Sequence, residues 1–128
     1  MLKSTTAGIQ ISAKARYEPS YSAPKQRRFI FSYRITIENK SLHPFQLLRR
    51  TWEVFDSNGV VRTVEGKGVI GEQPIIKPGS SYTYNSACDL ETEYGSMSGS
   101  YLMINKDSQD FIHAQIPMFQ LATPWILN

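Results

Sequence analysis

The sequence has little cysteine and little histidine. Its 128 residues include one cysteine and two histidines. A single cysteine, Cys88, cannot form an internal disulfide, which argues against a secreted, disulfide-stabilised domain and favours a reducing compartment. We expect Cys88 to be a small, buried apolar residue. Neither His43 nor His113 lies in a recognisable catalytic pattern.

Long hydrophobic runs are also missing. No segment approaches the roughly 20 consecutive apolar residues that a membrane-spanning helix requires. Residues 1–6 contain no apolar stretch typical of a signal peptide. We therefore expect a cytoplasmic protein without membrane insertion.

A strong excess of charge of one sign is also missing. The formal net charge is +3 at pH 7, and the basic runs at 25–28 and 49–50 are short. Nucleic-acid-binding proteins usually carry a larger basic stripe on a recognisable fold, so this pattern disfavours nucleic acid as the partner. The carboxylates at 89–93 lack the spacing of an oxygen-rich metal loop. We predict no catalytic residue, no metal site and no cofactor.

Alternating apolar residues are the strongest structural signal. Segments 9–17 and 29–38 place an apolar side chain at every second position, as strands with one face on a core do. Asn58-Gly59 between apolar runs predicts a hairpin. Other strands are expected at 45–55, 60–65, 81–88, 100–105, 111–116 and 119–122. Seven to nine short strands without a convincing helix predict an all-β sandwich or barrel.

Glycine and proline mark the predicted connections. Segment 19–26 contains two prolines and is expected to be an exposed loop. Segment 94–99, Tyr-Gly-Ser-Met-Ser-Gly, is expected to be a loop that breaks the chain before the strand at 100–105. Pro117 is expected to interrupt the last strand and leave 119–122 as a short edge strand. Trp52 is expected in the core.

The segment 66–71, Gly-Lys-Gly-Val-Ile-Gly, spells the pattern G-x-G-x-x-G. In dinucleotide-binding folds a helix begins at these glycines and its free amides hold a pyrophosphate. Pro74 and Pro78 leave no room for that helix, which excludes a Rossmann-type site. Two interpretations remain: the glycines permit a bend or a close backbone approach, or successive amides form an anion-binding nest assisted by Lys67.

Several segments resemble the ApaG domain family. They follow one another in the family's order at 50–52, 64–74, 78–79, Tyr82, Tyr84, 94–101 and 116–121. The resemblance spans about 8–124, so we expect one domain over 1–128. It implies an immunoglobulin- or fibronectin type III-like β-sandwich of two antiparallel sheets. Thr51 stands where the family commonly has histidine, so chemistry at that histidine would not transfer.

The resemblance implies a binding role, and the missing catalytic motif predicts no enzymatic one. Bacterial members are associated with Co²⁺ and Mg²⁺ resistance, and eukaryotic relatives carry the domain where protein–protein interaction is inferred. A chain without membrane spans cannot conduct ions, so any effect on efflux would be indirect. We predict a non-enzymatic module that binds an unidentified protein; the alternative is a receptor for phosphate, pyrophosphate or a nucleotide at 66–71. The predicted binding residues are Arg50, Gly66, Lys67, Gly68, Gly71, Glu72, Tyr94, Met97 and Gly99.

Overall fold

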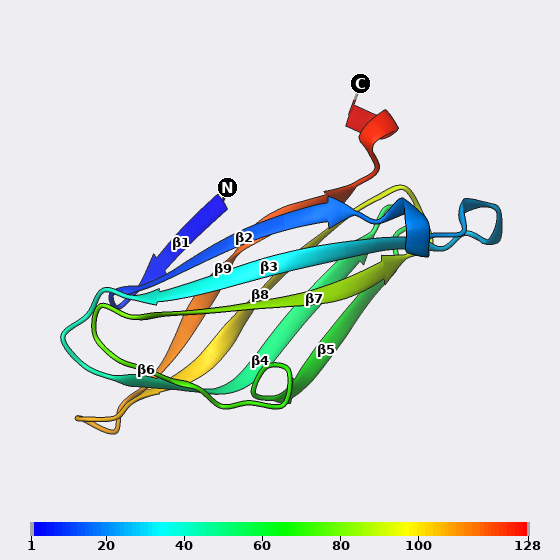
Figure 1. Ribbon diagram of the computed structural model, residues 1–128. Helices are drawn as coiled ribbons and strands as arrows, with labels where there is room; N and C mark the ends of the chain where they lie inside the picture. The colour runs from blue at the N-terminus through cyan, green and yellow to red at the C-terminus, as the bar shows by residue number, and fades with distance from the viewer. Residues whose placement is uncertain (1, 128) are drawn as a thin grey trace.

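The chain folds into two antiparallel sheets packed face to face, as the computed structural model of residues 2–127 shows (Figure 1). The first sheet has the order β1-β2-β3-β7, with β1 Leu2–Thr6, β2 Ile9–Tyr17, β3 Phe29–Asn39 and β7 Ser81–Leu90. The second has the order β5-β4-β8-β9, with β4 Phe45–Asp56, β5 Val61–Lys67, β8 Tyr94–Asn105 and β9 Phe111–Ala122. The short β6, Ile75–Ile76, also pairs with β4. The predicted β-sandwich is confirmed.

The core lies between the sheets and follows the predicted alternation. Every second residue of β3 from Phe29 to Ile37 is buried, which confirms the period-two pattern of that segment. Trp52 is buried as expected, with 2% of its surface exposed. The hairpin at Asn58-Gly59 is also confirmed, because β4 and β5 pair antiparallel on either side of it.

Within residues 2–127 helical structure is confined to single turns. The predicted loop at 19–26 contains two 3₁₀ turns, η1 (Pro19–Tyr21) and η2 (Pro24–Gln26), and η3 (Pro124–Leu127) follows β9. Among the described residues no helix has the length and apolar character needed to cross a bilayer.

The predicted loop at 94–99 is wrong, because these residues form the first half of β8. β8 pairs with β4 on one side and β9 on the other. A β-carbon on Gly95 would lie 2.2 Å from the carbonyl oxygen of Phe55, and one on Gly99 would lie 2.0 Å from that of Thr51. These two glycines therefore allow β4 to approach closely, and they do not break the strand.

The predicted interruption at Pro117 is also wrong. β9 runs continuously through it, and 119–122 is the end of that strand. The register of β8 and β9 shifts here: Gly99 pairs with Ile116 but Met97 pairs with Phe119. This bulge, on the edge strand of the sheet, accommodates a residue that has no backbone N–H to donate.

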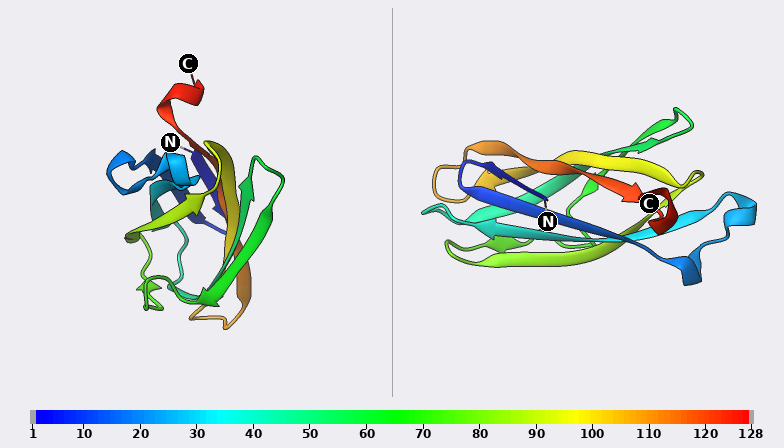
Figure 2. Two further views of the ribbon diagram at one scale, coloured as in Figure 1. Left: turned by 90° about the vertical axis from the view of Figure 1, so that its right-hand side faces the viewer. Right: turned by 90° about the horizontal axis from the view of Figure 1, so that it is seen from above.

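The two long sides of the sandwich differ. On one side β1 and β2 pack against β9, and the backbone N–H of Gln115 donates to Oγ1 of Thr6. On the other side the edge strands are β5 and β7. Both views in Figure 2 show the green β4–β5 hairpin standing apart from β7. The β2–β9 side is thus packed over most of its length, with a pocket of about 190 Å³ where β2 ends beside β9. We call the β5–β7 side, where the backbones of the two edge strands stand apart, the open seam.

Candidate functional site

A cleft of about 280 Å³ lies along the open seam between β5 and β7. We call it the seam cleft. The second sheet contributes Arg50, Trp52, Val54, Arg62, Val64 and Met97. The first sheet contributes Tyr33, Ser86, Ala87, Cys88 and Asp89. Most of these residues are the inward-facing members of their strands, so the cleft reaches into the space between the sheets.

A β-bulge in β4 directs Arg50 into this cleft. Phe45 and Leu47 are buried at the start of β4, and the register with β8 shifts between Leu47 and Arg49. After the shift, the even-numbered positions Trp52 and Val54 are the buried ones. An extra residue in one strand moves the following side chains to the opposite face. Arg50 therefore shares the inward face with Trp52, while Arg49 is exposed.

Gly66 makes room for the Arg50 guanidinium. The two residues are paired across β4 and β5. A β-carbon on Gly66 would lie 2.8 Å from both Nη1 and Nη2 of Arg50. Nη1 donates to the carbonyl oxygens of Lys67 at 3.2 Å and Gly68 at 2.9 Å. The arginine thus anchors the glycine loop, residues 66–72, to the wall of the cleft.

Aromatic rings form the floor of the cleft. The ring centroid of Trp52 lies 5.5 Å from that of Tyr33, 6.4 Å from that of Tyr101 and 5.9 Å from that of Phe119. Three of these contacts are edge-on, a favoured arrangement for aromatic pairs. Tyr101 also hydrogen-bonds, hydroxyl to hydroxyl, with Tyr84. Tyr33 and Trp52 line the cleft itself, and Tyr84, Tyr101 and Phe119 are buried beneath them.

The tyrosine and cysteine side chains in and beneath the cleft have raised pKa values. Burial raises the pKa of Tyr33, Tyr84 and Tyr101 above the ordinary tyrosine value, and nearby Arg50 only partly opposes this. Burial also raises the pKa of the Cys88 thiol, against the opposing effect of Arg62. These groups are therefore protonated at neutral pH, so the thiol is a poor nucleophile and the hydroxyls are hydrogen-bond donors.

Contacts between the sheets close the seam at both ends. At one end Nη2 of Arg62 reaches β7, where it donates to the carbonyl oxygen of Asp89, to its Oδ1 at 3.2 Å and to Sγ of Cys88 at 3.4 Å. At the other end the Tyr82 hydroxyl donates to Oε2 of Glu72 in the glycine loop at 3.2 Å. The seam cleft therefore has a defined length between these two contacts.

The glycine loop folds back on itself. Gly68 donates its N–H to the carbonyl of Leu48, and Val69 and Glu72 exchange backbone hydrogen bonds at 2.9 Å. Gly68 and Gly71 have φ of +63° and +79°, which favours glycine. A β-carbon on Gly68 would lie 2.1 Å from the carbonyl oxygen of Glu72. Three of the amides that an anion nest would use are thus occupied, and the glycines serve a tight bend.

The structure brings together only part of the predicted site. Arg50 and Met97 line the seam cleft, and Gly66, Lys67 and Gly68 contact Arg50. The other predicted residues have other positions: Glu72 at the end of the seam, Gly71 in open space, Gly99 beneath β4, and Tyr94 beside Gln120. Sequence reasoning missed Tyr33, Arg62, Val64 and Ser86. These four residues share one sequence signal: each occupies one of the alternate, inward-facing positions of its strand, β3, β5 or β7.

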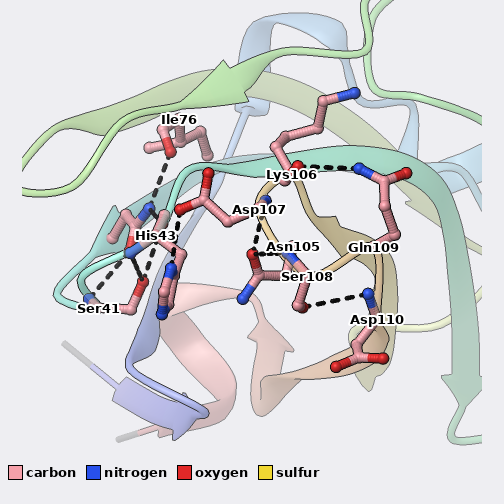
Figure 3. Close-up of polar contacts among 10 residues, drawn as sticks. Ser41, His43, Ile76, Asn105, Lys106, Asp107, Ser108, Gln109 and Asp110 are labelled. Atoms are coloured by element: carbon pink, nitrogen blue, oxygen red, sulfur yellow. Dashed lines mark hydrogen bonds and ion pairs between the residues drawn. The ribbon is translucent and has the colours of Figure 1, made fainter.

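A second polar cluster lies where the turn after β3 meets the turn between β8 and β9 (Figure 3). Nδ1 of His43 lies 2.8 Å from Oδ2 of Asp107, and both side chains are about half exposed. Asn105 accepts hydrogen bonds from the backbone N–H groups of Asp107 and Ser108. Across residues 2–127, no three His, Cys, Asp or Glu side chains gather closely enough to hold a metal ion.

Known proteins similar to this chain agree with the fold. A family model described as the ApaG domain matches residues 19–105. Protein ApaG of Pseudomonas aeruginosa is 45% identical over 127 residues, covering 99% of this chain and 100% of that protein. Protein ApaG of Brucella suis is 41% identical over 124 residues, covering 97% and 95%.

Solved structures extend the similarity to three dimensions. A crystal structure described as an ApaA protein from Bordetella pertussis has a TM-score of 0.88 at 35% identity, covering 91% of this chain and 94% of that one. The C-terminal domain of wzt, at 10% identity and a TM-score of 0.56, covers 94% and 76% and is alike in fold alone. Together with the sequence matches, these findings show that the chain belongs to the ApaG domain family.

Proposed function

We propose that this chain is a non-enzymatic module that binds a protein partner in the seam cleft. The observation that carries the proposal is the open seam, where the edge strands β5 and β7 border a cleft of about 280 Å³. On the opposite side β1 and β2 pack against β9 and leave a smaller pocket of about 190 Å³. Edge strands offer unpaired backbone groups, and an added strand can place alternate side chains into an adjacent groove. Arginine, tryptophan and tyrosine, which line this cleft, are also enriched at interface hot spots.

The protonation of the cleft supports binding over catalysis. Covalent or acid–base catalysis needs a nucleophile and a base within hydrogen-bond reach of each other. The cleft instead holds the protonated hydroxyl of Tyr33 and the protonated thiol of Cys88 beside Arg50 and Arg62. Such a set donates hydrogen bonds and offers apolar surface.

The proposal accommodates an indirect association with Co²⁺ and Mg²⁺ resistance. The partner, a transporter or a signalling protein, would carry the effect, and this chain would supply the recognition surface. Cys88 is a free thiol that contacts Arg62, which is compatible with action in the reducing cytoplasm.

The alternative function is a receptor for phosphate, pyrophosphate or a nucleotide at the glycine loop. One observation favours it: Arg50 contacts this loop and Lys67 belongs to it, although Lys67 pairs with Arg49 on the outer face of the sheet, opposite Arg50. The occupied amides of Gly68, Val69 and Glu72 weigh against it.

A blocked cleft tests the proposal. Ser86→Trp places a large ring in the cleft, whereas Asn85→Trp places the same ring on the outer face of β7, where Asn85 accepts a hydrogen bond from Arg34. Immobilised wild-type and variant proteins are exposed to native cell lysate, and captured proteins are quantified by mass spectrometry. We expect a partner that is retained by wild type and Asn85→Trp and lost with Ser86→Trp. Equal capture by both variants would refute a role for the cleft.

Titration with pyrophosphate distinguishes the small-ligand receptor from the partner-binding module. Saturable amide shifts confined to residues 66–72, and abolished by Lys67→Ala, would establish the small-ligand receptor. Under our proposal these amides show no saturable shifts.

A further inference from the structure

An arginine without a counter-ion lies in the seam cleft. The ion pairs within residues 2–127 join Arg16 to Glu18, His43 to Asp107 and Arg62 to Asp89. Arg50 belongs to none of them, although it is half-buried and faces inward. Both of its hydrogen bonds to described residues come from Nη1. Nη2 and Nε therefore remain available as donors to a bound group.

The surroundings of Arg50 select one kind of anion. A guanidinium can form two parallel hydrogen bonds with either a carboxylate or a phosphate, so geometry alone does not distinguish these anions. The second cation of the cleft, Arg62, is already neutralised by Asp89. One uncompensated positive charge matches a carboxylate, whereas a phosphate ester carries about −1.5 to −2. A phosphate would leave excess negative charge beside the buried side chain of Tyr33.

The residues beyond Arg50 select an apolar neighbour for that carboxylate. Trp52 and Val54 follow Arg50 at every second position on β4 and are buried, whereas Val64, which pairs with Trp52 across β4 and β5, is 42% exposed. Val64 therefore provides the accessible apolar surface of the cleft two positions along from Arg50. Successive inward side chains of a strand are about 6.6 Å apart, at about 3.3 Å per residue. An extended segment lying along the seam has the same period, so an acidic side chain at Arg50 places the side chain two residues away on this apolar wall.

We propose that the seam cleft recognises an extended protein segment with an acidic and an apolar residue two positions apart, the carboxylate binding Arg50. This inference rests on the proposed partner-binding function and names the partner's chemistry. The adjacent Arg49 provides a matched control, because it carries the same charge on the outer face of β4.

Selection from a library of random seven-residue peptides tests the inference. The peptides are blocked at both ends, selected on wild-type protein and counter-selected on Ser86→Trp. We expect enrichment of Asp or Glu two positions from an apolar residue. Affinities of the enriched peptides are then measured for wild type, Arg50→Gln and Arg49→Gln, with amide spectra confirming that each variant is folded.

The expected result is a loss of affinity of about tenfold to hundredfold in Arg50→Gln, the range for a charge-assisted hydrogen bond, and no loss in Arg49→Gln. Replacing the peptide's Glu by Gln on wild-type protein gives the same loss without altering the fold.

Other outcomes separate this inference from the proposed function. One such outcome is a set of selected peptides that fail to bind Ser86→Trp and yet contain no acidic residue, or bind Arg50→Gln as tightly as wild type. Such peptides would overturn carboxylate recognition by Arg50 and would leave the seam cleft as the binding site. Equal losses in Arg50→Gln and Arg49→Gln also overturn it, because they indicate unspecific attraction to positive charge. A library that yields no peptide excluded by Ser86→Trp overturns it too, and the lysate capture then decides the proposed function.

Discussion

Arg50 and Gly66 act as one unit in this molecule. An arginine that faces the interior of a sandwich needs space and hydrogen-bond acceptors, since burying an unpaired polar group costs free energy. Gly66 provides the space, and the carbonyls of Lys67 and Gly68 provide the acceptors. The same unit fixes the start of the glycine loop and positions a positive charge at the edge of the cleft.

Two glycine substitutions should lower the free energy of unfolding by different amounts, because different atoms surround the two glycines. In Gly66→Ala the new methyl meets the end of a flexible arginine side chain, so we expect a loss below about 1 kcal/mol. In Gly99→Ala it meets the backbone oxygen of Thr51 in a paired strand, 2.0 Å away. We expect a loss of about 3 kcal/mol or a failure to fold. Urea denaturation measures both free energies of unfolding, and equal losses would contradict this contrast.

The buried tyrosines predict a fall in stability at alkaline pH. Burial raises the pKa of Tyr84 and Tyr101 above the unfolded value of about 10. As the pH rises, the unfolded chain releases these protons first, so their contribution is complete below about pH 10 and declines above it. Each tyrosine adds a slope of up to about 1.4 kcal/mol per pH unit. The slope above pH 10 should be shallower in Tyr84→Phe; an unchanged slope would refute this assignment.

The strands differ in how far their residues predict them. β2 and β3 have one face on the core, so strict alternation revealed them. β8 was split wrongly, because Gly95 and Gly99 are turn-forming residues in isolation and only the approach of β4 explains them. β1 and β6 were not predicted: β1 has little buried surface, and β6 is two residues long. Both depend on pairing with a neighbouring strand.

The turn after β3 depends on one buried asparagine. Nδ2 of Asn39 donates to the carbonyls of His43 at 2.7 Å and Ile76 at 2.8 Å, and its Oδ1 accepts from the N–H and the hydroxyl of Ser41. Asn39→Ala leaves buried groups unsatisfied, so we expect a loss of about 2–4 kcal/mol by chemical denaturation. His43→Ala removes only an exposed ion pair and should cost below about 1 kcal/mol. A larger loss in His43→Ala would show that the ion pair organises this turn.

For the whole molecule, the sequence located one wall of the candidate site but not the cleft. Arg50, Met97 and the glycine segment were identified through family resemblance. The cleft itself arises from tertiary structure: the bulge in β4 turns Arg50 inward, and only the sheet order leaves β5 and β7 facing each other. Tyr33 and Ser86 come from β3 and β7, far from Arg50 in sequence. Local patterns contain no information on that proximity.

In-cell photo-crosslinking from β5 tests partner binding in the seam cleft most directly. A photoreactive phenylalanine analogue replaces either Val64, which lines the cleft, or Thr63, which pairs with the exposed Glu53 on the outer face. Partner binding in the cleft predicts a discrete protein adduct from position 64 and none from position 63. Adducts of equal yield from both positions, or no adduct from position 64, would contradict it.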